Sequence, residues 1–393
     1  MGGPGAAPAP RPAAGAGAAR RAAPPPPPDP VGGRRWFALP GPLALEAGGT
    51  LPGARLAYQT WGSPRPDGSN AVLVLHALTG DSHLTGPAGP GHPTAGWWTE
   101  LVGPGRPLDT ERWFVVAPNV LGGCQGSTGP SSAAPDGRPW GSRFPFLTQR
   151  DQVAAEVLLA DALGIDRWAL VVGGSMGGMR ALEWAVAHPR RVGALLVLAT
   201  AAAASAEQIA HASAQLHAIR ADRGWHGGDY HHLPPGRGPH RGLGLARRLA
   251  QITYRSEPEL AARFGRAPQH GEHPWRGGRF AVESYLDHHA AKLAHRFDAG
   301  SYVVLNEAMN AHDLGRGRGG TAAALRRAAV PALVAAVDSD RLYPPRQQAE
   351  LAALLPDADA LRVLSSPYGH DGFLLESAQV APLLAELLPG ARR

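Results

Sequence analysis

A serine flanked by glycines has the spacing of a nucleophilic centre. Residues 171–178 are VVGGSMGG, so Ser175 stands in a Gly-x-Ser-x-Gly pattern. An apolar run precedes this serine and a helix-like segment follows it, which is typical of a sharp strand-to-helix turn that exposes a hydroxyl above a sheet. Such a hydroxyl can attack a carbonyl and carry an acyl group. A tight turn in which Ser175 only caps the following helix is the alternative.

A serine hydroxyl needs a base, and the base needs an acid that orients it. In folds with this turn, the acid and then the histidine follow the serine along the chain, each after a later strand. His370 lies beyond the apolar segment 361–364 and is the candidate base, with a surface-loop histidine as the alternative. Asp338 and Asp340 both lie just past the segment 331–337, and their spacing does not choose between them.

Backbone N–H groups must stabilise the negative charge that develops on the attacked carbonyl oxygen. The residue after the nucleophile supplies one N–H, and a loop after an early strand supplies the second. Residues 76–80 (HALTG) follow the apolar run 70–75. The sequence therefore predicts an oxyanion hole formed by the N–H groups of Leu78 and Met176.

Short apolar runs alternate with helix-like segments on both sides of the serine. This pattern predicts strands over residues 55–60, 70–76, 113–118, 169–172, 193–199, 331–337 and 361–364. It predicts helices over residues 178–187, 243–254 and 282–297. Continuous apolar strands between helices indicate an α/β fold, with a mostly parallel central sheet flanked by helices on both faces.

Composition divides the chain into three parts. Residues 1–33 are rich in Ala, Pro, Gly and Arg, and we expect a disordered tail because such a segment cannot bury enough apolar surface. Residues 34–200 and 325–393 carry the strand signals, whereas residues 201–324 contain helix-like segments without a clear strand. We therefore expect one α/β core with an inserted helical lid domain.

The composition also limits the class of protein. The chain has 393 residues, 44% of them hydrophobic, yet no apolar stretch reaches the ~20 residues of a membrane helix. The net charge of +6 comes from scattered arginines, with Lys292 as the single lysine, and does not indicate nucleic-acid binding. Cys124 is the single cysteine, and no Cys/His spacing indicates a metal site. The N-terminus lacks the apolar core of a signal peptide, so we expect a cytoplasmic protein.

Ten motifs follow one another along the chain. They are NAVLVLHALTGDSH (70–83), GWW (96–98), NVLGGCQGSTGP (119–130), VVGGSMGGMRALEW (171–184), GGDY (227–230), ITY (252–254), VESYL (282–286), FD (297–298), SDRLYP (339–344) and GHDGFLLE (369–376). Together they resemble the homoserine O-acetyltransferase family, which has the α/β-hydrolase fold. The resemblance covers the chain from about residue 35 to the C-terminus and leaves out the N-terminal tail.

The resemblance implies a role for each matching residue. Ser175 matches the family's nucleophile, His370 its base and Asp340, rather than Asp338, its acid. The N–H groups of Leu78 and Met176 match its oxyanion hole.

Three further residues match the family's substrate pocket. Arg247 corresponds to the substrate-binding arginine and Asp371 to the substrate-binding aspartate, while Tyr254 is a further pocket candidate on the same helix face as Arg247. An arginine can bind the carboxylate of an amino acid with paired donors, and an aspartate can bind its ammonium. Without the resemblance, Arg247 would be a solvated member of the basic stretch 237–248, and Asp371 a loop acid.

The implied reaction is transfer of an acetyl group from acetyl-CoA to the hydroxyl of L-homoserine, in methionine biosynthesis. The implied mechanism is ping-pong, through an acetyl-serine intermediate, with acetyl-CoA as co-substrate and no permanently bound cofactor. The resemblance also implies a homodimer formed through the lid. Alternatives on the same fold are an O-succinyltransferase, an L-serine O-acyltransferase and an esterase or thioesterase. A non-catalytic Arg-rich binding protein is the alternative of a different class.

Overall fold

A computed structural model describes residues 1–2, 31–234 and 236–388. The predicted disordered tail, residues 1–33, lies almost entirely outside the described residues. None of the described helices combines the length and the apolar character needed to cross a bilayer.

A central sheet of eight strands organises the described part of the chain, in the order β1-β4-β8-β5-β9-β10-β11-β12. These strands are β1 (Arg35–Ala38), β4 (Arg55–Trp61), β8 (Phe114–Pro118), β5 (Ala71–Leu75), β9 (Leu170–Gly174), β10 (Leu195–Leu198), β11 (Ala332–Val337) and β12 (Arg362–Leu364). The pairs β1–β4 and β4–β8 are antiparallel, and every other pairing in the sheet is parallel. The predicted mostly parallel sheet is confirmed. The antiparallel edge of the sheet, formed by β1 and β4, was not predicted.

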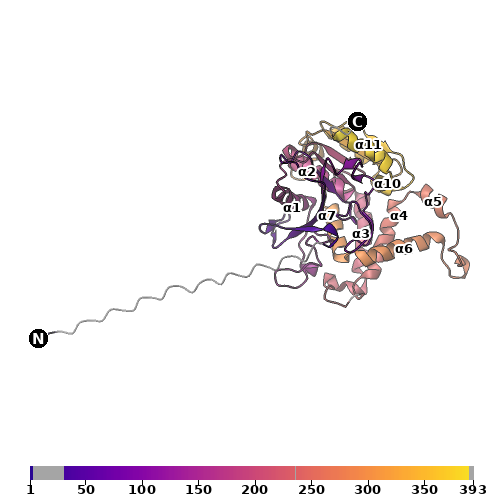
Figure 1. Ribbon diagram of the computed structural model, residues 1–393. Helices are drawn as coiled ribbons and strands as arrows, with labels where there is room; N and C mark the ends of the chain where they lie inside the picture. Colours follow the sequence, from indigo (N-terminus) through magenta and orange to yellow (C-terminus); the bar gives the residue numbers. More distant parts are fainter. Residues whose placement is uncertain (3–30, 235, 389–393) are drawn as a thin grey trace.

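Both faces of the sheet are buried. In β5, Leu73 and Leu75 belong to one apolar core, and Val72 and Val74 belong to the other. Successive side chains on a strand point to opposite faces, so an unbroken apolar strand requires cover on both. The first core includes side chains of α1 (Gln149–Ala162), α2 (Met176–Ala187) and α9 (Pro345–Leu354), and the second includes side chains of α11 (Ser377–Leu387). Figure 1 shows α1 and α2 together, with α11 apart from them.

Between β10 and β11, the described residues form helices and no strand of the main sheet. The helices are α3 (Ala206–Arg220), α4 (His240–Tyr254), α5 (Glu257–Phe264), α6 (Ala281–Arg296), α7 (Ala299–Asn310) and α8 (Thr321–Leu325). Figure 1 shows α4, α5 and α6 extending to one side of the molecule, away from α1 and α2. The division into a core of residues 34–200 and 325–393 and a lid of residues 201–324 stays a prediction, and α8 crosses its second boundary.

A third apolar core joins these helices to the end of the sheet that carries Ser175. It contains Leu78 and Met176, which follow β5 and β9, together with Leu216 of α3, Leu243 of α4 and Tyr302 of α7. The inserted helices are therefore packed directly over the ends of the central strands.

Smaller elements make up the rest of the secondary structure in the described residues. They are the paired strands β2 (Leu43–Ala44) and β3 (Thr50–Leu51), the paired strands β6 (Val102–Gly103) and β7 (Leu108–Asp109), the short helix α10 (Gly372–Leu375), and the 3₁₀ helices Val31–Gly33, Gly141–Arg143, Pro189–Arg191, Arg223–Gly228, Pro274–Arg276 and Gly369–Asp371.

Candidate active site

Ser175 occupies a strained turn between β9 and α2. Its φ of 55° and ψ of −125° lie in a region that L-residues rarely adopt, at a cost of about 1–3 kcal/mol. The two glycines of the motif permit this turn. A Cβ on Gly177 would overlap the carbonyl oxygen of Leu75 at the end of β5, and a Cβ on Gly173 would overlap the carbonyl oxygen of Gly177. The start of α2 can therefore lie directly against the end of β5.

Ser175, His370 and Asp340 form one line of hydrogen bonds between buried side chains. His370 Nε2 lies 2.8 Å from Ser175 Oγ, and His370 Nδ1 lies 2.7 Å from Asp340 Oδ2. The other carboxylate oxygen of Asp340 accepts the N–H groups of Leu342 at 2.8 Å and Tyr343 at 2.9 Å. The acid is thus fixed by the backbone, and it fixes the imidazole in turn.

Asp338, the other candidate acid, lies in a different environment. It is exposed, and its Oδ1 accepts the N–H of Ser366 at 3.0 Å. The choice that spacing left open therefore has a geometric answer, because Asp340 is the aspartate hydrogen-bonded to His370.

The surroundings of His370 favour its protonated form. Burial by itself lowers the pKa of the imidazole, but the charge of Asp340, the hydrogen bond to Asp340 and the charge of Asp371 raise it, and the net shift is upward. The ring of Tyr343 stacks on the imidazole with a centroid distance of 5.0 Å, and the ring of Tyr254 lies 5.8 Å away. The imidazole is suited to take a proton from Ser175 and to remain in place when charged.

The predicted oxyanion donors come from two elements, the loop after β5 for Leu78 and the start of α2 for Met176. Met176 is the first residue of α2, where N–H groups have no partner within the helix and the helix dipole is positive. Within the described ranges, neither the N–H of Leu78 nor that of Met176 donates a hydrogen bond. Both groups therefore remain available to an oxyanion.

A buried histidine holds the loop of Leu78. His76 Nδ1 lies 2.8 Å from the carbonyl oxygen of Ala77, and His76 Nε2 accepts the N–H of Val120 at 3.0 Å. Burial, aided by the charge of Arg180, lowers the pKa of His76 to about 3. The ring is therefore neutral, with its proton on Nδ1, and this tautomer satisfies both hydrogen bonds.

A cavity of about 250 Å³ opens in front of Ser175 and His370, and the three predicted pocket residues, Arg247, Tyr254 and Asp371, line it. The guanidinium carbon of Arg247 lies 5.2 Å from the centroid of the Tyr254 ring. Among the described residues, the buried Nη1 of Arg247 has no hydrogen-bond partner. An unpaired buried donor costs about 1–3 kcal/mol, so this nitrogen is prepared to bind an anionic group.

The family model of the alpha/beta hydrolase fold matches residues 70–377. The homoserine O-acetyltransferase of Thermobifida fusca (strain YX) is 67% identical over 360 residues, which cover 92% of this chain and 95% of the relative. The chain belongs to the homoserine O-acetyltransferase family. The resemblance in the sequence motifs and the predicted α/β-hydrolase fold are thereby confirmed.

Solved structures agree on the architecture. The homoserine O-acetyltransferase from Bacillus anthracis matches with a TM-score of 0.81 at 26% identity, covering 91% of this chain and 97% of that one. Esterase E22 matches with a TM-score of 0.82 at 25% identity, covering 90% of this chain and 99% of that one. An acyltransferase and an esterase therefore share this arrangement of core and inserted helices.

Other side chains in this acetyltransferase-family cavity were not predicted from the sequence. Trp97 and Arg296 line it, and Arg296 Nη2 donates a hydrogen bond of 2.8 Å to the carbonyl oxygen of Thr79, next to Leu78. Trp97 lies in a matched motif, and Arg296 directly precedes another, so proximity to a motif was the available signal.

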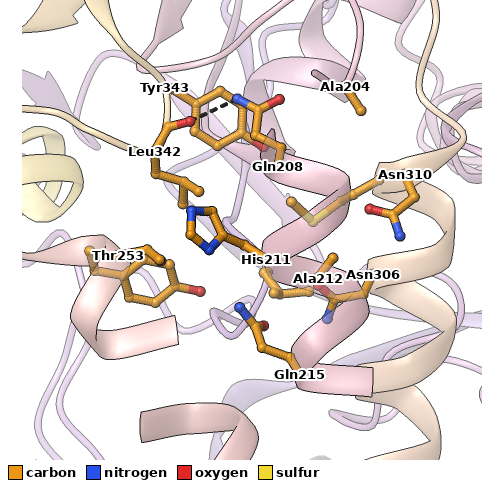
Figure 2. A pocket seen from close by; sticks show the side chains of 13 residues that line it. Ala204, Gln208, His211, Ala212, Gln215, Thr253, Asn306, Asn310, Leu342 and Tyr343 are labelled. Atoms are coloured by element: carbon orange, nitrogen blue, oxygen red, sulfur yellow. Dashed lines mark hydrogen bonds between the residues drawn. The ribbon is translucent and has the colours of Figure 1, made fainter. Parts of the chain in front are cut away.

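A second, smaller cavity of about 40 Å³ adjoins the first, since Leu78 and Tyr254 line both. Figure 2 shows its polar side chains, among them Gln208 of α3, whose Nε2 donates a hydrogen bond of 2.8 Å to the carbonyl oxygen of Leu342. This volume is enough for a few water molecules. The bond from Gln208 ties an inserted helix to the loop that holds Asp340.

Proposed function

We propose that this protein transfers the acetyl group of acetyl-CoA to the hydroxyl of L-homoserine, a step of methionine biosynthesis, through an acetyl-Ser175 intermediate. One observation carries the proposal. The hydrogen-bonded line of Ser175, His370 and Asp340 opens into a cavity that Arg247 and Asp371 also line. Among the described residues, Arg247 Nη1 has no hydrogen-bond partner. A nucleophile for acyl groups and a charged pair suited to an amino acid thus share one cavity.

In the first half-reaction, Ser175 Oγ attacks the thioester carbonyl carbon while its proton passes to His370 Nε2. The N–H groups of Leu78 and Met176 hold the oxyanion. When the tetrahedral intermediate collapses, the carbon–sulfur bond breaks and His370 returns the proton to the departing CoA sulfur. Loss of one oxyanion donor typically costs about 3 kcal/mol of transition-state stabilisation.

In the second half-reaction, the hydroxyl of homoserine takes the place of CoA. His370 Nε2 accepts its proton, and the hydroxyl oxygen attacks the acetyl carbon of the intermediate. The ester bond to Ser175 Oγ breaks, and His370 returns the proton to that oxygen. The same imidazole therefore acts as base and then as acid in both halves.

The charged groups of the cavity suit the acceptor. Paired donors of Arg247 can bind the carboxylate of homoserine, and the carboxylate of Asp371 can bind its ammonium. The ring of Tyr254 lies 5.2 Å from the guanidinium carbon of Arg247 and 5.8 Å from the imidazole of His370, so Tyr254 is close to both groups that would handle the acceptor.

The proposed lid, residues 201–324, protects the intermediate from water. Its helices pack over the strand ends through Leu216, Leu243 and Tyr302. An acetyl-serine that meets bulk water is hydrolysed, so cover of the cavity favours transfer over hydrolysis.

The proposal also includes an oligomeric state and a compartment. Leu245 and Ile252 are 50% and 44% exposed and lie seven residues apart on α4, hence on one helix face. We propose that this face is covered in a homodimer formed through the lid. Acetyl-CoA acts as a co-substrate and not as a bound cofactor, and its use is consistent with a cytoplasmic enzyme.

Two measurements test the proposed function. Mass spectrometry of the protein mixed with acetyl-CoA is expected to show one added acetyl group, which Ser175→Ala lacks. Release of CoA is then expected to be sustained only when homoserine is present, and to be faster with acetyl-CoA than with succinyl-CoA. A wild-type protein that turns over both substrates without acetylation would overturn the covalent scheme.

A second candidate, an esterase or thioesterase, is favoured by the similarity to esterase E22. The same serine, histidine and aspartate would serve it, with water in place of homoserine. Sustained release of CoA at an equal rate with and without homoserine would select this candidate.

A further inference from the structure

Arg255 connects the last turn of α4 to the loop that carries His370 and Asp371. It is the residue immediately after the helix, and its backbone is extended, with φ −106° and ψ 147°. Its side chain is largely buried, and its Nε lies 3.2 Å from Asp371 Oδ2. Arg255 directly follows the motif ITY (252–254), but no matched motif contains it.

The backbone around Arg255 is held on both sides. A Cβ on Gly369 would lie only 2.7 Å from the carbonyl oxygen of Tyr254, and Ser256 Oγ donates a hydrogen bond to the carbonyl oxygen of Pro367. Arg341 Nη2 donates a hydrogen bond of 2.8 Å to the carbonyl oxygen of Arg255 itself. The guanidinium therefore projects from a fixed point between the two elements.

The contact between Arg255 and Asp371 is a pairing of charges and not a hydrogen bond. Although Arg255 Nε is close to the carboxylate, it has no hydrogen-bond partner in the described part of the chain. No described N–H or O–H group donates to Asp371 either, and its side chain is 20% exposed where it lines the cavity. The carboxylate is thus balanced in charge while its hydrogen-bonding positions stay open.

The charged groups that face Asp371 are Arg255, Arg247, His370 and Asp340. Arg247 has the role of binding the acceptor carboxylate, and His370 must change its charge during the reaction. Arg255 is the cation that takes no part in either task. A buried carboxylate without a paired cation is costly and tends to become neutral, and a neutral carboxyl binds an ammonium poorly.

We propose that Arg255 is a positioning residue for the acceptor. It holds Asp371 charged and facing the cavity, so that Asp371 can bind the ammonium of an amino-acid acceptor in the second half-reaction. This inference rests on the proposed function. Glu259 gives Arg255 a second anion, with Oε1 3.8 Å from Arg255 Nη1, so the arginine stays paired when the ammonium engages Asp371.

The test compares the two half-reactions in Arg255→Met and Arg255→Lys. The control is Arg263→Met, because Arg263 is exposed and contacts the same Glu259, at 3.5 Å, without reaching Asp371. The first half-reaction is measured as the burst of CoA release, and the second as kcat/KM for homoserine. We expect Arg255→Met to lower kcat/KM for homoserine roughly 10- to 100-fold, with a much smaller loss in the burst. Arg255→Lys is expected to regain most of the loss, and Arg263→Met to behave as wild type.

An acceptor without an ammonium group, 4-hydroxybutyrate, separates this role from a merely structural one. The penalty of Arg255→Met is expected to disappear with this acceptor, since it has nothing to place on Asp371. An equal loss in both half-reactions, an equal loss with both acceptors, or a lysine variant no better than the methionine variant would overturn the inference. Should the methionine variant not fold, the lysine variant and the two acceptors still give the comparison. A wild-type protein that forms no acetyl-enzyme would instead refute the proposed function.

Discussion

The substitution Asp340→Asn tests the hydrogen-bonded line at its acid. Asp340 Oδ1 accepts the N–H groups of Leu342 and Tyr343, and the carbonyl oxygen of an asparagine can keep both bonds. The amide NH₂ then faces His370 Nδ1 in place of Oδ2. Because an NH₂ group only donates, the imidazole must accept at Nδ1 and carry its proton on Nε2, toward Ser175. In this tautomer it cannot take the serine proton.

The expected loss follows from that tautomer. The corresponding exchange in a serine-protease triad lowers kcat roughly 10⁴-fold, equivalent to about 5.5 kcal/mol of transition-state stabilisation. We expect a loss of this order in Asp340→Asn, with little change in thermal stability, since the side chain keeps its size and its two backbone bonds.

The assay is the initial rate of CoA release at saturating acetyl-CoA and homoserine, with the melting temperature as a check on folding. Asp338→Asn is the matched control, because Asp338 is exposed and accepts the N–H of Ser366 instead. It is expected to stay within about twofold of wild type. A folded Asp340→Asn protein that keeps more than about a tenth of the wild-type rate would refute the reasoning from the tautomer.

Three further predictions concern titratable groups in the interior or partly covered. The pKa of His370 lies above its ordinary value of about 6.5. We therefore expect kcat/KM for acetyl-CoA to fall as the pH drops through this raised value and the imidazole becomes protonated, whereas an acid limb centred below about pH 6.5 in a pH–rate profile would contradict this. Arg180→Met leaves Glu156 buried without its partner at 2.5 Å and is expected to cost about 3–5 kcal/mol in urea unfolding, whereas a loss under 1 kcal/mol would show that the pair is dispensable. Cys124 is half-buried, and desolvation raises the pKa of its thiol to about 12. We therefore expect an aromatic disulfide reagent to label it roughly 10³-fold more slowly in the native protein than in urea, and equal rates would argue against a raised thiol pKa.

The central strands could be predicted because their signal is local. The apolar segment 331–337 became β11 (Ala332–Val337), since every residue of a strand buried on both faces is apolar. The edge strand β1 could not be predicted, because Arg35–Ala38 alternates weakly and is a strand only through its pairing with β4. Helix α1 was missed although Thr148 and Asp151 form a capping box at its start, a signal that was present in the sequence.

The candidate site could be predicted in part for a similar reason. Ser175 and His370 follow strands, and strand ends meet at one edge of a parallel sheet, so the order of elements places them together. At the sequence level, only the family resemblance distinguished Asp340 from Asp338. The two residues are two positions apart on one turn, so the pattern of strands and loops around them is the same. Arg255 and Arg296 come from inserted helices, and tertiary packing sets how these helices are oriented over the sheet. The sequence pattern of a helix does not indicate that orientation, so these two residues could not be placed in the site.

The inserted helix α4 carries Arg247 and Tyr254, whereas the serine, histidine and aspartate all stand on loops of the sheet. Under the proposed function, the arginine that binds the acceptor carboxylate comes from an inserted helix, whereas the nucleophile, the base and the ammonium-binding Asp371 come from loops of the sheet. Exchange of a single helix could redirect the acyl group to another alcohol, or to water, without rebuilding the nucleophile. That modularity gives a structural reason why one scaffold accommodates both a transferase and an esterase among its solved relatives.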